Sequence, residues 1–268
     1  MNLENKVVII TGASSGIGKA LTYELAKRKA KLVLAARRID KLNELAASLV
    51  NTDILTVEAD VSDETDCKKI IDKTIERFGT IDVLINNAGI SMRAIFEELD
   101  LNVIRQVMDI NFWGTVYCTK YALPFLLKSK GSVVGVSSVA GFKGLPGRTG
   151  YSASKFAIGG FLEVLRIENL KKGLHVLLAC PGFTTSNIRN TALAKDGSMQ
   201  GESPRDEDKM MSAEEVARHI ANAIVKRKRS IILTTQGKMV VLFSKFFPKW
   251  TDKMVYNHMA KEPDSPIK

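Results

Sequence analysis

Three residues that could move a proton to a carbonyl oxygen lie close together in the middle of the chain. Tyr151 and Lys155 are four residues apart, so on a helix their side chains share one face, about one turn apart. Ser138 precedes Tyr151 and adds a hydroxyl. A tyrosine has an ordinary pKa of about 10, and a nearby ammonium favours the phenolate and lowers that pKa. The residue types therefore predict a site that polarises a carbonyl and delivers a proton to it.

A strand, a turn and a helix must hold these residues. The apolar run at 132–136 predicts a buried strand that ends just before Ser138. A glycine- and proline-rich turn follows and lets the chain fold back before a helix begins near Tyr151. The turn contains Gly141, Gly144, Pro146, Gly147 and Gly150. Such a site reduces a carbonyl only if the rest of the chain holds a hydride donor.

The N-terminal third has the pattern of a dinucleotide-binding turn. A short apolar, β-branched run at 6–11 leads into G-A-S-S-G-I-G, and a helical pattern follows at 17–29. Gly12, Gly16 and Gly18 permit a tight turn and a close approach of backbone to phosphate, and the helix N-terminus favours a pyrophosphate. The spacing is G-x-x-x-G-x-G, not the common G-x-G-x-x-G.

The second predicted strand, 31–36, ends in Arg37 and Arg38, with no acid between residues 35 and 38. An acid at this place would bind the ribose 2′-hydroxyl of NAD, whereas an arginine can bind the 2′-phosphate of NADP. The sequence therefore predicts NADP. The alternative is that the two arginines bind no cofactor and are simply exposed to solvent at the beginning of the helix 39–49.

Polar residues also follow the third and fourth predicted strands. The strand 54–59 leads to Asp60 and Val61, and Ser62 is the expected N-cap of a helix at 63–78. Asp60 either faces the adenine or holds its own loop. The strand 81–85 ends in Asn86, Asn87, Ala88 and Gly89, where the amides either cross-link neighbouring loops or lie beside the cofactor.

Alternation of strands and helices predicts a single α/β domain over residues 1–268. It is a Rossmann-type, doubly wound parallel sheet of about seven strands in a three-layer α/β/α arrangement. Ligands bind such folds outside the carboxyl ends of the strands, where these motifs lie.

In the second half we expect one long helical region at 95–127, which contains a buried Asn111. A strand at 174–179 leads to Pro181 and Gly182, and the hydroxyls of Thr184, Thr185 and Ser186 follow near the expected nicotinamide site. Residues 187–211 lack periodicity and are predicted to be a substrate lid. Ser212 is an expected N-cap, and a last strand is predicted at 230–234.

Residues 236–268 form a basic, apolar C-terminal extension for which three interpretations stand. It is a helix pair packed on the core or another subunit, a membrane-surface segment, or part of a nucleic-acid site with 226–229. In the second interpretation the aromatic side chains of Phe243, Phe246, Phe247 and Trp250 enter lipid and Lys245, Lys249 and Lys253 meet head groups. No motif supports nucleic-acid binding.

Taken together, the chain resembles the short-chain dehydrogenase/reductase family over residues 3–235. The resemblance rests on T-G-A-S-S-G-I-G, N-N-A-G, the set Ser138, Tyr151 and Lys155, and the Pro-Gly pair at Pro181. It implies that Tyr151 is the acid–base catalyst, that Ser138 orients the carbonyl, and that Lys155 binds the nicotinamide ribose and lowers the tyrosine pKa. Asn111 would hold a proton-relay water. Family members often have threonine where this chain has Ser186.

The residues expected to contact the cofactor come from all these motifs. They are Gly12, Ser14, Ser15, Gly16, Ile17, Gly18, Arg37, Arg38, Asp60, Val61, Asn87, Ala88, Gly89, Tyr151, Lys155, Pro181, Gly182, Thr184 and Ser186. The predicted function is NADP-dependent hydride transfer between the nicotinamide and a carbonyl or secondary alcohol. The substrate is expected to be lipid- or steroid-like if the tail binds a membrane, because the apolar Ile95, Phe142, Leu145 and Phe183 are also expected near the pocket. A non-catalytic dinucleotide-binding regulator is the alternative.

The composition of the chain indicates its compartment, its metal content and its partners. Three cysteines and three histidines without ligand spacing predict no metal site and a reducing compartment. No apolar signal region precedes the first strand and no run of about 18 apolar residues occurs, so a cytoplasmic protein is expected, associated with a membrane only if the tail binds one. The net charge of +10 is unevenly distributed, since residues 221–268 carry ten lysines or arginines and three acids. A homo-oligomer, dimer or tetramer, is expected, and no nucleic-acid partner.

Overall fold

One parallel sheet organises the chain. The computed structural model describes residues 2–185, 188–201, 210–263 and 265–267. Within these residues seven strands lie in the order β3-β2-β1-β4-β5-β6-β7. They are β1 (Val7–Thr11), β2 (Lys31–Ala36), β3 (Ile54–Glu58), β4 (Val83–Asn86), β5 (Ser132–Val136), β6 (His175–Cys180) and β7 (Ser230–Ile232). The predicted doubly wound sheet is confirmed.

The central strands are apolar on both sides because helices cover both faces of the sheet. All residues of β1, β4 and β5 are buried, and strands of this kind read as continuous apolar runs. Val8 lies beside Leu32 in β2 and Val83 in β4. The core therefore continues through the sheet from one helical layer to the other.

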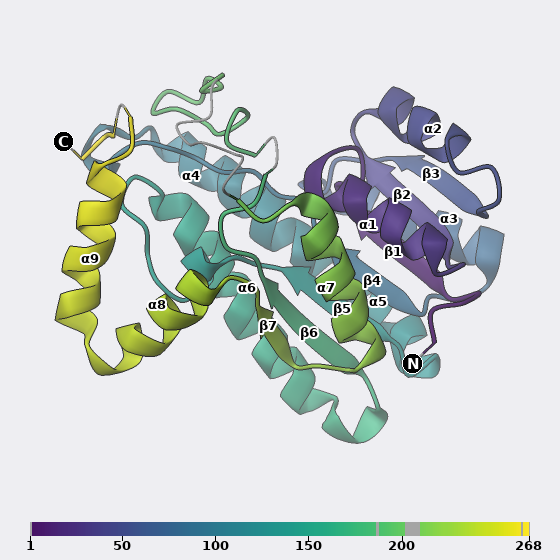
Figure 1. Cartoon of the computed structure of the whole chain (residues 1–268). Coiled ribbons are helices and arrows are strands. Elements are labelled where there is room, and N and C mark those ends of the chain that lie inside the picture. The colour runs from purple at the N-terminus through teal and green to yellow at the C-terminus, as the bar shows by residue number, and fades with distance from the viewer. Residues whose placement is uncertain (1, 186–187, 202–209, 264, 268) are drawn as a thin grey trace.

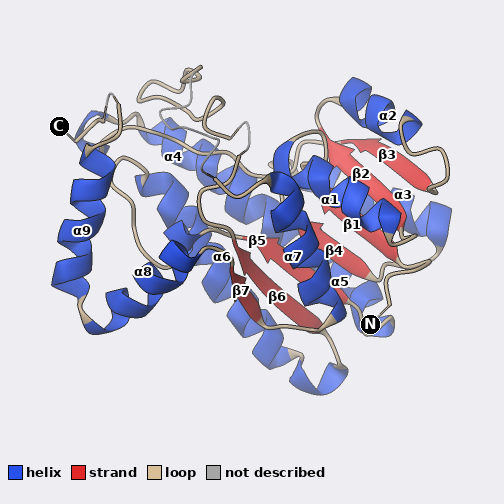
Figure 2. Ribbon diagram, viewed as in Figure 1, coloured by secondary structure: helices blue, strands red, loops and turns tan. Residues whose placement is uncertain are grey.

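Figure 2 shows helices on both faces of the sheet, and Figure 1 names them. On one face α1 (Gly16–Lys27) packs over β1 and β2, α2 (Ile39–Ala47) over β2 and β3, and α7 (Ala213–Val225) over β6 and β7. On the other face lie α3 (Glu64–Phe78), α5 (Gly114–Lys128) and α6 (Thr149–Glu168). All three cysteines are buried in these layers.

The strand order reverses between β1 and β4. The chain runs from β1 outward through β2 and β3, then returns to β4 and continues to the other edge. The loops after β1 and β4 therefore leave the sheet side by side and turn to opposite faces, which opens a crevice at their carboxyl ends.

The predicted long helical region at 95–127, with a turn at its N-terminal end, is largely confirmed, because the chain is helical without a break from residue 101 to residue 128. The π-helical turn inside it was not predicted. A 3₁₀ turn (Phe96–Glu98) precedes α4 (Leu101–Met108), and a π-helical turn (Asp109–Trp113) separates α4 from α5. The wide turn places Asn111, which is fully buried, where its amide can bond to the backbone of Ile90. π-turns often occur at functional sites.

Two helix starts differ from expectation. Asp63, not Ser62, caps α3, because its carboxylate accepts from Thr65 N at 2.7 Å while Ser62 bonds to Asp60. The last strand ends at Ile232 because Thr234 caps α8, accepting from Gly237 N at 3.0 Å. The expected N-cap Ser212 is confirmed, since its hydroxyl accepts from Glu215 N at 3.1 Å.

The C-terminal extension contains a pair of helices, which is compatible with both the packed and the membrane-surface interpretations. Helices α8 (Thr235–Phe246) and α9 (Pro248–Ala260) lie together to one side of the sheet (Figure 1). The basic run at 226–229 lies at the other end of β7, where Arg227 Nη2 donates to Gly173 O at 2.6 Å. Among the described residues, no helix has the length and apolarity needed to cross a membrane.

Candidate active site

A cavity of about 800 Å³ lies at the carboxyl ends of the strands. This volume is at the upper end of the range usual for ligand sites, about 300–1,000 Å³. The predicted site residues that line it are Gly12, Ser14, Ser15, Gly16, Ile17, Arg37, Arg38, Asp60, Val61, Asn87, Ala88, Gly89, Ser138, Tyr151, Lys155, Pro181, Gly182 and Thr184. Gly18 and Asn111 are outside the lining, and Ser186 lies outside the described residues.

The glycine turn after β1 forms one end of the cavity. Gly12 and Gly16 have φ values of 66° and 52°, a left-handed conformation that favours glycine. A Cβ on Gly12 would lie 2.8 Å from the Cα of Ala88. The turn therefore exposes backbone at the N-terminus of α1, and its residues fit the pyrophosphate of a dinucleotide.

Gly18 has a packing role. A Cβ there would lie only 2.2 Å from the carbonyl oxygen of Gly12. Asn87 holds the same turn from the other side, since its Nδ2 donates to Thr11 O at 2.9 Å. The cross-linking role considered for the asparagine is therefore present, and Asn87 also lines the cavity.

Arginines border the cavity beyond the second strand. Arg38 Nη2 donates to Ser14 Oγ in the glycine turn at 3.2 Å. Arg37 Nη1 lies 3.7 Å from Asp60 Oδ2, and its side chain is 62% exposed. Asp60 also accepts from the backbone and hydroxyl of Ser62, at 3.0 and 2.7 Å, so its carboxylate holds its own loop.

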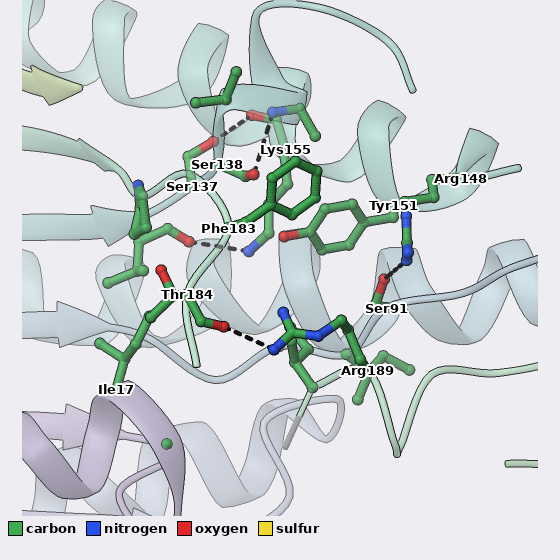
Figure 3. Close-up of a pocket in the computed structure, with 18 of the residues that line it drawn as sticks. Ile17, Ser91, Ser137, Ser138, Arg148, Tyr151, Lys155, Phe183, Thr184 and Arg189 are labelled. Carbon is green, nitrogen blue, oxygen red and sulfur yellow. Dashed lines mark hydrogen bonds between the residues drawn. The ribbon is translucent and has the colours of Figure 1, made fainter. Parts of the chain in front are cut away.

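The chemical centre joins the end of β5 to the start of α6. Figure 3 shows the Tyr151 hydroxyl pointing toward Ser138 and Lys155. Ser138 caps a short turn after β5, where its Oγ accepts from Ala140 N at 3.2 Å. The Ser138 side chain also acts on the Tyr151 hydroxyl and lowers the pKa of the phenol. The sequence spacing thus brings the two hydroxyls together.

Lys155 is buried under this pair. Its Nζ donates to Val136 O at 3.0 Å and lies 5.6 Å from the centre of the Tyr151 ring. Burial lowers the pKa of Lys155 from 10.5 to about 8. A buried ammonium with one carbonyl partner is an electrostatically costly group, which is typical of functional sites.

Opposing influences act on the pKa of Tyr151, and the lowering expected from Lys155 stays a prediction. Burial raises the pKa of Tyr151, and the Ser138 side chain and the charge of Arg148 only oppose that rise. Burial removes water from the phenolate, and this cost exceeds the stabilisation by neighbouring charges.

Asn111 lies directly behind the centre. Its Oδ1 accepts from Ile90 N at 2.8 Å, and its Nδ2 donates to Ile90 O and Ser154 Oγ at 3.0 and 2.9 Å. A Cβ on Gly89 would lie 3.1 Å from Asn111 Oδ1 and 3.4 Å from Lys155 Nζ. Asn111 therefore fixes the loop that carries Gly89 against Lys155, while its relay role stays a prediction.

Two arginines beside Tyr151 were missed from sequence. Arg148 is buried, and its Nη1 donates to Ser91 Oγ at 3.0 Å and Met92 O at 3.2 Å. Arg189 is also buried, and its Nη2 donates to Thr184 O at 3.0 Å. Both guanidinium groups lie beside the tyrosine ring, away from Ser138 (Figure 3). An arginine in a polar loop normally faces solvent, so only its position three residues before Tyr151 hinted at a role for Arg148.

The far wall of the cavity comes from the predicted lid and the tail. Ile188, Thr191, Leu193 and Met199 line it from the segment after Thr185. Val240, Phe243, Met254, Val255 and Met259 line it from α8 and α9. Of the four apolar residues expected here, Leu145 and Phe183 line the cavity, whereas Ile95 and Phe142 do not. Phe243, expected in lipid, is half-buried in this wall.

Comparison with known proteins agrees with this geometry. The short chain dehydrogenase family model matches residues 6–197. The chain is 38% identical over 279 residues to an 11-beta-hydroxysteroid dehydrogenase A of Sesamum indicum, covering 98% of this chain and 79% of that protein. It is 46% identical over 191 residues to an 11-beta-hydroxysteroid dehydrogenase-like 2 of Arabidopsis thaliana, covering 70% and 62%.

Solved structures show the same fold. A short-chain dehydrogenase/reductase from Burkholderia phymatum in complex with NAD superposes with a TM-score of 0.84 at 24% identity, covering 93% of this chain and 96% of that one. An alcohol dehydrogenase from Thermococcus sibiricus complexed with 5-hydroxy-NADP has a TM-score of 0.75 at 26% identity, covering 85% and 95%.

A doubly wound sheet with a glycine cradle and a serine–tyrosine–lysine centre defines a dinucleotide-dependent oxidoreductase. The chain belongs to the short-chain dehydrogenase/reductase family.

Proposed function

We propose that the enzyme uses NADP to interconvert an apolar, lipid- or steroid-like carbonyl compound and its secondary alcohol. The observation that carries the proposal is one cavity in which Ser138, Tyr151 and Lys155 lie between a nucleotide cradle and an apolar wall. A regulator that only senses the cofactor would need the cradle but no proton donor.

The residues divide the chemistry as follows. When bound, the nicotinamide supplies or accepts the hydride. Ser138 donates a hydrogen bond to the substrate oxygen and holds it beside the Tyr151 hydroxyl. Tyr151 gives its proton to that oxygen in reduction and takes it back in oxidation. Lys155 places a positive charge below the phenol and stabilises the phenolate that forms.

The preference for NADP rests on the arginines after β2. Arg38 is anchored to Ser14 of the glycine turn, and Arg37 presents an exposed guanidinium beside it. Two positive groups at this place favour a 2′-phosphate over a bare ribose hydroxyl.

The apolar substrate rests on the wall that α8 and α9 add. Five of its lining side chains, Val240, Phe243, Met254, Val255 and Met259, are apolar. Apolar walls with few polar groups are usual for sites that bind hydrophobic small molecules. The names of the similar plant proteins, which refer to hydroxysteroids, support the same substrate class.

Titration with NADPH and NADH, followed by cofactor fluorescence, tests the cofactor preference. We expect tighter binding of NADPH, which Arg37→Asp combined with Arg38→Asp weakens at least tenfold while binding of NADH is kept or improved. Arg218→Asp, an equally exposed arginine on α7, is the matched control and should change neither affinity. Equal affinities for the two cofactors in the parent protein would overturn the NADP proposal.

A panel of steroid and long-chain ketones, each followed by loss of NADPH absorbance, tests the substrate class. Turnover restricted to small polar carbonyls would overturn it. Cofactor binding without turnover of any carbonyl or alcohol would favour the regulator instead.

We also propose that the enzyme acts as a homo-oligomer in a reducing compartment. Trp113, Phe156, Val164 and Ile167 are exposed apolar side chains on the helical layer that contains α5 and α6. The mass of the protein in light scattering tests this, and a monomer at micromolar concentration would contradict it.

A further inference from the structure

Helix α8 presents an apolar stripe to solvent. Met239, Leu242 and Phe246 are 50%, 54% and 68% exposed. Their spacing of three and four residues places them on one face of the helix, while Gly237 and Val241 on the other face are buried. A helix on the surface of a globular protein normally turns its polar face outward. The outer face of α8 is therefore unusual.

The apolar surface continues around the turn into α9. Phe247 and Trp250 are 58% and 55% exposed. Both rings pack on Phe243, with ring centres 6.4 and 5.8 Å apart. In Figure 1 this turn lies at the lower left, away from the sheet. The stripe and the turn thus form one projecting apolar surface, which we call the α8–α9 surface.

Positive charge surrounds the α8–α9 surface. Lys238 and Lys245 on α8 and Lys249 and Lys253 on α9 are all exposed. The one acid in these two helices, Asp252, is paired with Lys143. Lysines beside exposed aromatic and aliphatic side chains fit anionic head groups above acyl chains. A second copy of the chain would bring the same lysines against each other, which disfavours this surface as a symmetric dimer contact.

The α8–α9 surface is continuous with the active-site cavity. Met239 and Trp250 are half-exposed on the surface and also line the cavity, next to Val240 and Phe243. An apolar molecule could therefore move from the surface to Tyr151 along apolar side chains.

We propose that α8 and α9 dock the enzyme onto the surface of a lipid bilayer with anionic head groups, with the cavity open toward the lipid. Met239, Leu242, Phe246, Phe247 and Trp250 enter the interface, and the four lysines contact the head groups. The substrate class of this proposal rests on the proposed function, whereas the docking itself does not. The helices lie on the membrane and do not cross it.

Trp250 can report the contact directly. The chain has two tryptophans, so Trp113→Phe leaves Trp250 as the single emitter. With vesicles of phosphatidylcholine and phosphatidylglycerol, we expect its emission to shift to the blue and to be quenched by brominated acyl chains. Vesicles of phosphatidylcholine alone should give a weaker signal, and added salt should reduce the difference. Unchanged Trp250 emission in a protein that still binds NADPH would overturn the proposal.

Matched variants separate docking from folding and catalysis. Leu242→Ser with Phe246→Ser should reduce flotation with anionic vesicles at least tenfold, since neither side chain lines the cavity. The control Leu101→Ser with Leu170→Ser, at comparable exposures of 57% and 68%, should leave flotation unchanged. Lys245→Ser and Lys249→Ser should each cost about fivefold in partitioning, the equivalent of about 1 kcal/mol. Lys226→Ser and Lys228→Ser, exposed at the other end of β7, are the control.

Measurements in solution keep the two proposals apart. The serine variants should bind NADPH and reduce a small water-soluble ketone as the parent does. A parent protein that binds vesicles but neither binds NADPH nor reduces any ketone would contradict the proposed function and leave the docking proposal standing. Light scattering gives the mass of each protein in solution. If the parent does not bind vesicles and the serine variants have a lower mass than the parent, the α8–α9 surface contacts a second copy of the chain, and the membrane proposal is overturned.

Discussion

The guanidinium of Arg93 and the carboxylate of Glu262 lie 3.6 Å apart, with side chains only 7% and 4% exposed. Arg93 Nη2 also donates to Pro263 O at 2.6 Å, and Arg93 N donates to Leu193 O at 2.8 Å. Arg93, in the loop that follows β4, therefore joins the segment after Thr185 to the end of α9. This contact fixes the wall that the tail adds to the cavity.

Removing the charge of Glu262 should loosen this wall. Glu262→Gln leaves the Arg93 guanidinium buried without its counter-charge, and breaking a buried pair in this way costs about 3–5 kcal/mol. We expect hydrogen exchange in α9 to accelerate at least tenfold while the affinity for NADPH is kept. Asp252→Asn is the control, because its carboxylate is 66% exposed and such pairs contribute about 0–1 kcal/mol. Equal exchange in both variants would contradict the anchoring role.

Tyr151→Phe should abolish proton transfer and spare cofactor binding. Phenylalanine keeps the ring on α6 but has no hydroxyl, so kcat should fall by about 10²–10⁴. NADPH affinity should change less than threefold. Tyr121→Phe is the matched control, since its hydroxyl bonds to Glu64 on the outer surface of the helices. Residual activity of Tyr151→Phe above a tenth of the parent value would reject the assignment.

Gly18→Ala should disrupt the nucleotide cradle. The added Cβ would lie 2.2 Å from Gly12 O and 2.7 Å from Asn87 Nδ2, so the turn must move. We expect at least a tenfold loss of NADPH affinity together with a lower free energy of unfolding. Gly160→Ala has no atom within 4 Å of its new Cβ. In helix α6 it should stabilise the protein by about 0.5–1 kcal/mol. Unaltered NADPH binding by Gly18→Ala would show that the turn is not the cradle.

The stability of the cofactor-free protein should depend on pH through Lys155. Burial lowers its pKa to about 8, whereas the unfolded chain keeps the ordinary 10.5. Between these values the unfolded state binds more protons, so the free energy of unfolding rises with pH there. Below pH 8 both states are protonated, and the cost of burying the charge, on the order of 3 kcal/mol, is fully present.

Lys155→Met should remove this dependence. Urea unfolding at about pH 7 and about pH 9.5 should show a rise in stability for the parent that is smaller by about 1–2 kcal/mol in the variant. Lys120→Met, an exposed lysine on α5, should retain the rise. The same slope in parent and Lys155→Met would mean that Lys155 stays charged in the folded protein across this range.

Much of the fold could be predicted because strands of a covered parallel sheet are local apolar runs. The runs at 31–36 and 132–136 coincide with β2 and β5. The pairing of Tyr151 and Lys155 could also be predicted, since helical spacing alone places both side chains on one face. The π-helical turn at Asp109–Trp113 could not be predicted from the sequence, because it depends on a hydrogen bond between Asn111 and the backbone of Ile90 in another part of the chain.

The sequence by itself determined the order of strands and helices, the glycine turn and the proton-transfer residues, since each depends on neighbours within a few positions. Only the tertiary structure decided which distant groups surround Tyr151. It buried Arg148 beside the ring and raised the pKa of the phenol by removing water. It also turned the apolar stripe of α8 outward and joined it to the cavity. Burial is a property of the packed chain, and no local pattern states which face of a helix the rest of the protein will cover.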